Sequence, residues 1–332
     1  MKKKIIVTGG AGFIGSHLCE FLINKSDISK IILIDNFKDG SLENIKSIKN
    51  NKKLKIKKVD IRNKDKLFSA FENNIDAVIH LAAQSDIVPS IENPVDYLET
   101  NFNGTLNILN LMNKFKIKKI IYAASSSCYG IPKKYPTGEN SEIDPKYPYS
   151  FSKYLAESLI KNWSKIYKIN YLSLRLFNVY GIRSRTNNAY GAVMGIFLKQ
   201  KIMNRPLTIV GNGKQKRDFI NVIDVVNAFH KCLKTKKWNE IYNVGSGNPH
   251  TINYLAKLIG GKKIYLPKRP AEPDQTYAKI TKIKKNLIWK PKITFEKGIE
   301  EVLKNKNYWN KALLWDKKKI KKATALWFKL LS

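Results

Sequence analysis

A tyrosine and a lysine four residues apart, Tyr149 and Lys153, form the pair in this sequence best suited to proton transfer. On a helix this spacing puts both side chains on one face, and a cationic lysine lowers the pKa of a neighbouring phenol. A phenolate formed in this way can remove the proton of a hydroxyl group while hydride leaves the same carbon. The alternative is that Lys153 only forms a surface pair with Glu157, again four residues on.

The same spacing occurs at Tyr129 and Lys133, as chance predicts for a chain with 16 tyrosines and many lysines. A glycine and a proline lie between these two residues, so they cannot form an ordinary helical turn. Pro148, by contrast, suits the first turn of a helix that carries Tyr149. We therefore predict that Tyr149 is the acid/base and that Tyr129 is not.

Three consecutive serines, Ser125, Ser126 and Ser127, supply the hydroxyl that would orient a substrate. They follow a strand-like run, and parallel strands present catalytic groups at their carboxyl ends. A hydroxyl both donates and accepts, so it can relay a proton. The alternative is that the three serines only fill a loop.

A glycine-rich loop near the start of the chain is typical of a dinucleotide site. A strand-like run ends at Thr8, glycines follow at positions 9, 10, 12 and 15, and a helix-like run begins. Glycine lets the backbone turn tightly and approach a pyrophosphate, which the helix N-terminus behind it favours. An acidic residue, Asp35, lies 20 residues past Gly15 at the end of the next strand-like run.

Asp35 indicates which dinucleotide the loop binds. A carboxylate there accepts hydrogen bonds from the adenosine ribose diol and repels a 2′-phosphate, which favours NAD over NADP. Lys38 nearby keeps NADP open as an alternative, and Asp35 with Asn36 could also merely open a turn.

Short apolar runs alternate with helix-like segments through the first half of the chain. The strand-like runs are Lys4–Thr8, Ile31–Ile34, Leu54–Val59, Ala77–His80, Lys119–Ala123 and Tyr171–Leu176. The helix-like segments are Gly15–Ile23, Lys64–Phe71, Asn103–Phe115 and Ser150–Tyr167. This alternation predicts an α/β fold with a Rossmann-like, doubly wound parallel sheet.

Beyond residue 180 the alternation loosens. A helix-like Val222–Leu233 and a strand-like Glu240–Val244 are expected to return to the sheet. We therefore predict a dinucleotide-binding domain of residues 1–180, completed by 218–247. Residues 181–217 and 248–332 would form a smaller, mixed substrate-binding lobe over the carboxyl edge of the sheet.

The net charge of +35 would ordinarily suggest nucleic acid as a partner. Only seven of the 61 basic residues are arginine, however, and the lysines are spread along the whole chain. Specific readout of bases usually depends on arginine. A general drift of composition toward Lys, Asn and Ile explains the charge better, so we expect no specific nucleic-acid partner.

The composition also bears on compartment and metals. The three cysteines, Cys19, Cys128 and Cys232, lie far apart, which favours neither a disulfide framework nor a zinc site. The apolar run after the basic start is too short for a signal peptide, and no stretch reaches the ~18 apolar residues of a membrane span. We expect a cytoplasmic protein without a metal or a membrane partner.

Taken together, these segments resemble the extended short-chain dehydrogenase/reductase superfamily, and within it the nucleotide-sugar 4-epimerases, over nearly the whole chain. The resemblance makes Ser125, Tyr149 and Lys153 the catalytic residues. It implies NAD contacts at Gly9, Gly12, Phe13, Ile14, Gly15, Asp35, Asn36, Asp60, Ile61, Leu81, Ala82, Ala83, Asn101, Tyr149 and Lys153.

The same resemblance implies a set of substrate contacts. Asn178, Arg217 and Arg269 would meet the diphosphate, Glu272 the ribose, and Ala192 and Val193 the nucleobase side. Ser126 or Ser127 would lie beside the sugar. Thr276 occupies the position of the family's size gate, where a bulky aromatic residue excludes an acetamido group.

Two features of these segments need explanation. Five of the seven arginines lie in or beside them, which suggests bidentate recognition of phosphate: Arg175, Arg183, Arg185, Arg217 and Arg269. At Lys279, where the resemblance leads us to expect aspartate, the sequence departs from the family. The register of Pro273–Lys282 therefore stays open by a residue, and Tyr277 is the alternative gate.

The residues that follow Ser125 narrow the choice of reaction, because neither of them is acidic. Related dehydratases carry Asp-Glu after the catalytic hydroxyl and related decarboxylases carry Glu, whereas this chain has Ser126 and Ser127. Elimination of water needs an acid and a base beside the sugar. The resemblance thus implies 4-epimerisation of a UDP-hexose, namely UDP-glucose or UDP-galactose, with the N-acetylated forms as further candidates. The alternative within the family is a UDP-glucuronate 4-epimerase.

Other classes of function remain open. A net nucleotide-sugar reductase or dehydrogenase would exchange its cofactor at each turnover. A non-catalytic NAD sensor or polyanion-binding protein would not need the complete set of Ser125, Tyr149 and Lys153.

The resemblance also implies a homodimer formed through the Asn103–Phe115 and Ser150–Tyr167 helices. The basic C-terminal stretch Ile320–Leu331 is expected to pack on the protein, or else to lie on a membrane surface.

Overall fold

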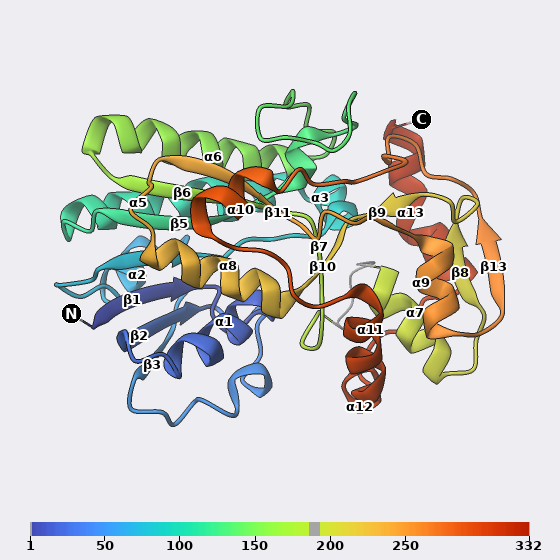
Figure 1. Cartoon of the computed structure of the whole chain (residues 1–332), viewed down its shortest axis with the longest axis horizontal. Coiled ribbons are helices and arrows are strands. Elements are labelled where there is room, and N and C mark those ends of the chain that lie inside the picture. Colours follow the sequence, from blue (N-terminus) through green and yellow to red (C-terminus); the bar gives the residue numbers. More distant parts are fainter. Residues whose placement is uncertain (1, 186–192, 332) are drawn as a thin grey trace.

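The computed structural model describes residues 2–185 and 193–331, and a seven-stranded parallel sheet forms its larger part (Figure 1). The strands run in the order β11-β6-β5-β4-β1-β2-β3. Their bounds are β1 Lys3–Thr8, β2 Ile28–Asp35, β3 Leu54–Lys58, β4 Ala77–His80, β5 Lys119–Ser125, β6 Asn170–Leu176 and β11 Glu240–Val244. The predicted α/β fold is confirmed, and Glu240–Val244 does return to the sheet beside β6.

Helices cover both faces of the sheet. On one face lie α1 (Phe13–Ile23) and α8 (Val222–Lys234), and on the other α2 (Lys64–Phe68), α5 (Gly104–Lys114) and α6 (Pro148–Tyr167). Successive strand residues serve opposite faces: Ile5 and Val7 pack with the α1 and α8 cluster, and Ile6 with the α5 and α6 cluster. Because both faces are covered, the central strands β1, β2 and β4 are largely apolar runs. Strands β3 and β6 instead alternate apolar and polar residues.

Shorter elements connect this core to a second apolar cluster. Those near the sheet are η1 Glu43–Ile45, α3 Ile87–Glu92, α4 Pro94–Leu98, the π-helical turn η2 Glu99–Asn103, η3 Ser126–Tyr129, β7 Asn178–Tyr180, β10 Phe219–Asn221 and α10 Thr281–Leu287. Those of the smaller lobe are α7 Val193–Ile202, β8 Leu207–Val210, β9 Lys216–Arg217, β12 His250–Thr251, α9 Ile252–Ile259, β13 Lys263–Leu266, α11 Phe295–Lys304, α12 Lys306–Trp309 and α13 Lys317–Leu331. Figure 1 shows this lobe on the right, with the C-terminus above it.

Several element ends differ from the expected ones. Helix α6 begins at Pro148, so Tyr149 lies in its first turn. Helix α2 ends at Phe68, three residues before the expected end, and Ala70 and Phe71 reach the core from a turn instead. Strand β5 runs on to Ser125, so the first of the three serines is the last residue of the strand.

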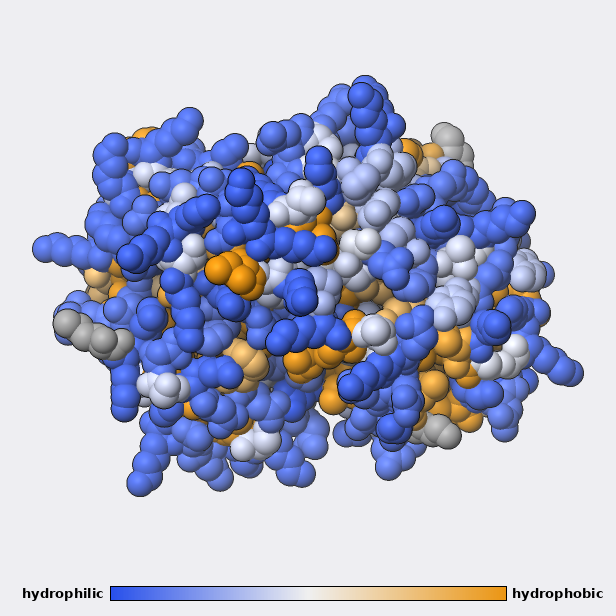
Figure 2. Space-filling model, viewed as in Figure 1, coloured by the Kyte–Doolittle hydropathy of each residue, from blue (hydrophilic) through white to orange (hydrophobic). Residues whose placement is uncertain are grey.

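The basic C-terminal stretch packs on the protein through its apolar stripe. Ile320 and Trp327 of α13 are 4% and 3% exposed, whereas the lysines of the helix face outward. No helix in the described ranges is long and apolar enough to cross a membrane. Hydrophilic residues cover most of the face shown in Figure 2, as the net charge of +35 leads one to expect.

A buried carboxylate, Asp218, ties the smaller lobe to the sheet. Its Oδ1 accepts from the backbone N of Ser246 at 2.6 Å, and its Oδ2 accepts from Gly247 at 3.1 Å and Ala278 at 2.9 Å. Burial raises the pKa of Asp218, and these hydrogen bonds act in the opposite direction. The side chain therefore fixes both the turn after β11 and the segment that ends in Ala278.

We predict that Asp218→Asn lowers the free energy of unfolding by about 1–3 kcal/mol, because an amide NH₂ cannot accept the backbone hydrogen bonds that one carboxylate oxygen receives. Urea denaturation followed by circular dichroism measures this change. The matched control is Asp274→Asn, since the Asp274 side chain is 79% exposed and its change should stay within about 0.5 kcal/mol. Equal stability of the two variants would contradict the anchoring role.

Candidate active site

The carboxyl ends of the central strands open on one pocket with a cavity volume of about 660 Å³. Of the predicted site residues that the structure describes, all but Asn101 line it. They are Gly9, Gly12, Phe13, Ile14, Gly15, Asp35, Asn36, Asp60, Ile61, Leu81, Ala82, Ala83, Ser125, Ser126, Ser127, Tyr149, Lys153, Asn178, Val193, Arg217, Arg269, Glu272 and Thr276. Ala192, predicted on the nucleobase side, lies outside the described residues.

The glycine loop has the close backbone packing that a dinucleotide site needs. Gly9 has φ +68°, and a Cβ there would lie 2.7 Å from the backbone N of Ala82. A Cβ on Gly15 would lie 2.0 Å from the carbonyl oxygen of Gly9. Helix α1 starts directly behind the loop, and its N-cap residue Gly12 has no side chain to cap the first-turn amides. The loop therefore offers free N–H groups and a helix N-terminus to an anion.

Asp35 is held by the loop that it faces. Its Oδ2 accepts from the backbone N of Ala11 at 2.9 Å, and its Oδ1 from Phe37 at 2.8 Å. Burial raises the pKa of this carboxyl. A carboxylate has about four acceptor sites, so Asp35 retains capacity to accept from a ribose hydroxyl. The Nζ of Lys38, the residue that left NADP open, lies 3.0 Å from Asp96 and is thereby engaged with a carboxylate.

An arginine that the sequence interpretation missed, Arg62, organises the part of the pocket around Asp60, a predicted cofactor contact. It binds both oxygens of Asp60, at 3.0 Å and 2.8 Å, and its Nη1 lies 2.6 Å from Asp96. Asn36 donates to Asp60 as well, at 2.9 Å. Hydrogen bonds from Arg62 hold the pKa of Asp60 well below its usual range. The only local signal was the position of Arg62 beside Asp60 and Ile61.

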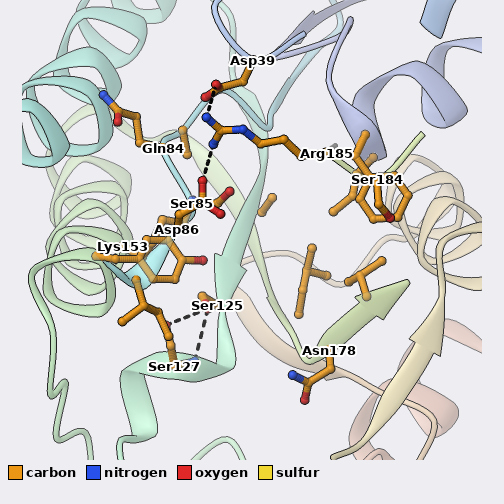
Figure 3. Close-up of a pocket in the computed structure, with 18 of the residues that line it drawn as sticks. Asp39, Gln84, Ser85, Asp86, Ser125, Ser127, Lys153, Asn178, Ser184 and Arg185 are labelled. Atoms are coloured by element: carbon orange, nitrogen blue, oxygen red, sulfur yellow. Dashed lines mark hydrogen bonds and ion pairs between the residues drawn. The ribbon is translucent and has the colours of Figure 1, made fainter. Parts of the chain in front are cut away.

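Tyr149 and Lys153 meet the serine turn at one wall of the pocket, as Figure 3 shows for Lys153, Ser125 and Ser127. Burial raises the pKa of Tyr149, while hydrogen bonds from Ser125 and Ser127 act to lower it. The two serine hydroxyls lie 2.8 Å apart. This is a connected set of hydroxyl groups around one phenol, which is what proton relay requires.

Lys153 is only 4% exposed, so the alternative of a surface pair with Glu157 is wrong. Its Nζ lies 4.3 Å from the centre of the Tyr122 ring, a cation–π contact. Burial lowers the pKa of Lys153 to about 7, and the carboxylate of Glu157 acts in the opposite direction. A lysine in this setting is poised to change charge near neutral pH.

Glu157 forms a buried ion pair with Arg175 instead. Arg175 Nη2 lies 2.6 Å from Glu157 Oε1, and both side chains are under 5% exposed. Arg175 also donates to the hydroxyl of Tyr129 at 2.9 Å. The interpretation of Arg175 as a phosphate-binding residue is therefore wrong, because its guanidinium is turned into the core. Tyr129 belongs to this same buried network, away from Tyr149.

Asn101 lies behind the pocket wall and joins two of its segments. Its Oδ1 accepts from the backbone N of Gln84 at 2.8 Å, and its Nδ2 donates to Gln84 O at 3.0 Å and Ser152 Oγ at 2.9 Å. Ser152 in turn donates to the carbonyl of Tyr149 at 2.8 Å. Asn101 stands in the π-helical turn η2, a geometry frequent at functional sites. In this arrangement its side chain positions Tyr149 and does not face the cofactor space.

A buried histidine supports the turn that carries Leu81 and Ala82. Thr105 Oγ1 donates to the carbonyl of Asn101 at 2.5 Å, so it accepts from His80 Nε2 at 2.9 Å. His80 Nδ1 must then accept from Thr8 Oγ1 at 2.6 Å. Burial lowers the pKa of His80 to about 3, which keeps the ring neutral. Thr8 Oγ1 finally accepts from the backbone N–H groups of the turn at 3.2 Å.

The predicted diphosphate arginines converge on one carboxylate. Arg217 Nη2 lies 2.8 Å from Glu272 Oε1, and Arg269 Nε lies 3.0 Å from Glu272 Oε2. The group of two arginines and one glutamate has a net charge of +1. It lies at the end of the pocket formed by the smaller lobe, where β9 and the segment after β13 meet.

The two candidate gate residues, Thr276 and Tyr277, differ in their position relative to the pocket. Thr276 lines it, whereas Tyr277, which is also described, does not. Thr276 Oγ1 donates to Asn178 Oδ1 at 2.8 Å and accepts from the backbone N of Asp218 at 3.0 Å. The Lys279 side chain, at the position where aspartate was expected, is exposed. The lysine at position 279 therefore does not remove Thr276 from the pocket lining.

Arg185 crosses the pocket between two acidic residues, Asp39 and Asp86 (Figure 3). Its Nη2 lies 2.6 Å from Asp39 Oδ1, and its other terminal nitrogen contacts Asp86. Burial raises the pKa of Asp86, and Arg185 opposes this shift. Sequence reasoning missed both carboxylates, although it singled out Arg185. Arg183 instead pairs with Glu20, at 2.7 Å.

No group of three or more His, Cys, Asp or Glu side chains within residues 2–185 and 193–331 is arranged to hold a metal ion. The cysteines Cys19, Cys128 and Cys232 are buried and unpaired with one another. The polar groups of the pocket are instead hydroxyls, amides, the two lysines Lys38 and Lys153, the carboxylate of Asp35, and arginine–carboxylate pairs.

Comparison with known proteins places this geometry in a family. The family model described as GDP-mannose 4,6 dehydratase matches residues 6–302. A putative UDP-glucose 4-epimerase of Methanocaldococcus jannaschii is 39% identical over 313 residues, covering 91% of this chain and 99% of the relative.

Two solved structures extend the comparison. UDP-N-acetylglucosamine 4-epimerase from Methanobrevibacter ruminantium, in complex with UDP-N-acetylmuramic acid, is 32% identical with a TM-score of 0.84, covering 92% of this chain and 98% of that one. UDP-glucuronic acid 4-epimerase from Bacillus cereus, with UDP-glucuronic acid and NAD, is 32% identical with a TM-score of 0.83, covering 92% and 99%. The chain belongs to the nucleotide-sugar 4-epimerase family of the extended short-chain dehydrogenase/reductases, as its sequence predicted.

The buried Glu157 carboxylate generates a prediction about pH. Since it favours the charged form of Lys153, Glu157→Gln should let Lys153 lose its proton at a lower pH. The alkaline limb of the kcat/KM profile for epimerisation should then move to lower pH. Circular dichroism at the assay temperature checks that the variant is folded, since Arg175 loses its partner. Glu142→Gln, at a carboxylate that is 67% exposed, is the matched control, and an unmoved limb in folded Glu157→Gln would refute the coupling.

Proposed function

We propose that this protein is an NAD-dependent UDP-hexose 4-epimerase acting through a transient 4-keto sugar. The observation that carries the proposal is one continuous pocket that joins three groups. It runs from the glycine loop, past Tyr149, Lys153 and Ser125, to the arginines of the smaller lobe. The relatives that act on UDP-sugars support it, as does the Bacillus cereus structure that holds NAD.

The cofactor end fits NAD on its own geometry. The uncapped amides of α1 and the close packing of Gly9 and Gly15 suit a pyrophosphate. Asp35 suits a ribose with a free 2′-hydroxyl, and Lys38, the residue that left NADP open, is engaged by Asp96. The chemistry supplied by bound NAD is reversible hydride acceptance at the nicotinamide.

Proton transfer is the work of the chain's own residues. Tyr149 takes the proton of the sugar's 4-hydroxyl as C4 is oxidised, and returns it to the same oxygen when C4 is reduced. Ser125 and Ser127 hydrogen-bond to the phenol and orient the sugar hydroxyl. A protonated Lys153 behind them stabilises the phenolate. The serine turn carries no carboxyl group to eliminate water, which separates this site from dehydratase chemistry.

Epimerisation requires the nucleotide to stay bound while the sugar turns. Arg217 and Arg269 would hold the diphosphate by bidentate, charge-assisted bonds, with Glu272 sharing them in the free enzyme. Asn178, Ser125 and Ser127 all line the same pocket, which is continuous between them and leaves space for a sugar. The 4-keto sugar can therefore rotate about its diphosphate link and present its other face.

Homodimerisation through α5 and α6, and a cytoplasmic location, remain predictions of the sequence. The alternative function is that of a net reductase or dehydrogenase. Such an enzyme can be distinguished by measurement, because it must exchange its cofactor at every turnover. UDP-glucuronate is the alternative substrate class.

Incubation with UDP-glucose, UDP-galactose, UDP-N-acetylglucosamine and UDP-glucuronate tests the reaction directly. NMR should show the C4 epimer of at least one hexose, without net NADH. A substrate deuterated at C4 should keep its label, because the hydride returns to the same carbon. Loss of the label to solvent would point to abstraction of a proton from carbon, and accumulation of NADH would point to the dehydrogenase alternative.

The two tyrosines provide a matched pair of variants. Tyr149→Phe should lower kcat by about 10²-fold or more while substrate affinity changes little, because the acid/base is lost. Tyr129→Phe removes only a hydroxyl of the buried network around Arg175, so its kcat should stay close to that of the wild type. The assignment fails if Tyr149→Phe is as active as Tyr129→Phe.

Thr276 predicts a broad substrate range. A threonine facing the pocket leaves room for an acetamido group, so both plain and N-acetylated UDP-hexoses should be turned over. Thr276→Tyr should selectively remove turnover of N-acetylhexosamines and retain glucose/galactose interconversion. Tyr277→Phe, beside it but outside the pocket lining, should change neither. A wild-type enzyme inactive on every acetamido sugar would show that the gate lies elsewhere.

A further inference from the structure

The C-terminal helix α13 lies beyond the residues that the family model matches and yet reaches the pocket. The family model ends at residue 302, whereas α13 spans Lys317–Leu331. One of its side chains, Trp327, lines the pocket and is 3% exposed. This tryptophan is 58 residues from Arg269 in sequence and packs against it in space.

The chain segment that carries Arg269 and Glu272 depends on contacts from elsewhere. Residues 267–273, all of them described, form neither helix nor strand. Ala271 within this segment has φ +53°, a left-handed conformation that a side chain disfavours. Strain of this kind persists only where surrounding contacts hold the backbone in place.

Two aromatic side chains make those contacts. The indole Nε1 of Trp327 donates to the carbonyl of Pro270 at 2.9 Å, and the hydroxyl of Tyr147 donates to the carbonyl of Ala271 at 2.6 Å. The two rings pack edge to face with their centres 5.0 Å apart. Tyr147 is the N-cap residue of α6, two positions before Tyr149. Consecutive carbonyls of the segment are thus fixed from the C-terminal helix and from the catalytic helix.

The same indole also positions the arginine itself. The guanidinium carbon of Arg269 lies 5.2 Å from the centre of the Trp327 ring, a cation–π contact. With its Nε 3.0 Å from Glu272, the guanidinium is held by the ring and by the carboxylate together. An arginine restrained in this way loses less side-chain entropy when it binds a phosphate.

Helix α13 is firmly seated on the rest of the protein. Its buried residues belong to the same apolar cluster as Val88 of α3, which also lines the pocket. Gln200 Nε2 donates to the carbonyl of Trp315 just before the helix, at 2.6 Å. The helix therefore adds a wall to the substrate end of the pocket, far along the chain from the glycine loop.

We propose that α13 is a working part of the sugar-nucleotide site, in which Trp327 is a positioning residue that holds Arg269 and Glu272 ready for the substrate diphosphate. The helix then contributes to substrate affinity and not to cofactor binding or to the proton transfer at Tyr149. This inference rests on the proposed assignment of Arg217 and Arg269 to the diphosphate.

The test measures binding of UDP to the purified, full-length holoenzyme by calorimetry, together with KM, kcat and NAD content. Trp327→Ala should weaken UDP binding and raise KM by about tenfold or more, since it removes a cation–π contact and a hydrogen bond. Its kcat should stay within about threefold and its NAD content should not change. Trp327→Phe, which keeps a ring but lacks the N–H group, should recover part of the affinity.

Two further variants make the outcome decisive. Leu330→Ala, at a residue of the same helix that is 58% exposed, should match the wild type. If Trp327→Ala is not folded, Trp327→Leu replaces it as an apolar substitution without ring or donor. Failure of the wild type to bind UDP would overturn the assignment of the arginines, and with it the proposed function. Wild-type UDP affinity in a folded Trp327 variant, or a loss of kcat and NAD with unchanged UDP affinity, would overturn the positioning role alone.

Discussion

Parallel pairing of the central strands is the constraint on which the rest of this structure depends. Because every strand of the sheet runs the same way, all of their carboxyl ends meet at one edge. The glycine loop after β1, Asp35 at the end of β2 and Ser125 at the end of β5 are brought together for this reason alone. The crossover helices supply the rest: α1 offers its N-terminus, and α6 places Tyr149 and Lys153 opposite the serines.

Much of the polar structure around the pocket serves to hold its walls. Thr8, His80 and Thr105 form a hydrogen-bonded chain. Because Thr105 donates to the carbonyl of Asn101, the donor and acceptor of every other hydrogen bond in the chain are fixed. Asn101 links the Gln84 segment to the first turn of α6. These groups are buried and satisfied, so the cost of burying them is offset and the walls have one defined arrangement.

Charge is handled differently inside the pocket and on the surface. Lysines dominate the exterior, whereas four of the seven arginines line the pocket, each paired with a carboxylate: Arg62, Arg185, Arg217 and Arg269. A fifth, Arg175, forms a buried ion pair with Glu157, the carboxylate that favours the charged form of Lys153. A buried pair of this kind adds little net stability, but it sets the field in which Lys153 titrates. The overall charge of +35 is thus a poor guide to function, and the positions of the few arginines in the pocket are a better one.

The sequence by itself determined the sheet, the glycine loop, Asp35 and the Tyr149–Lys153 pair, because strand and helix periodicity and glycine turns are local properties. It could not determine what Arg175 binds, since that depends on how β6 packs against α6. Nor could it show that Asn101 stands behind the wall, or that Arg62, Asp86 and Trp327 line the pocket. Which of Thr276 and Tyr277 lines the pocket likewise depends on the hydrogen bonds that hold residues 276–278 against Asp218. Contacts between side chains far apart in sequence are set by packing, and only the tertiary structure decides them.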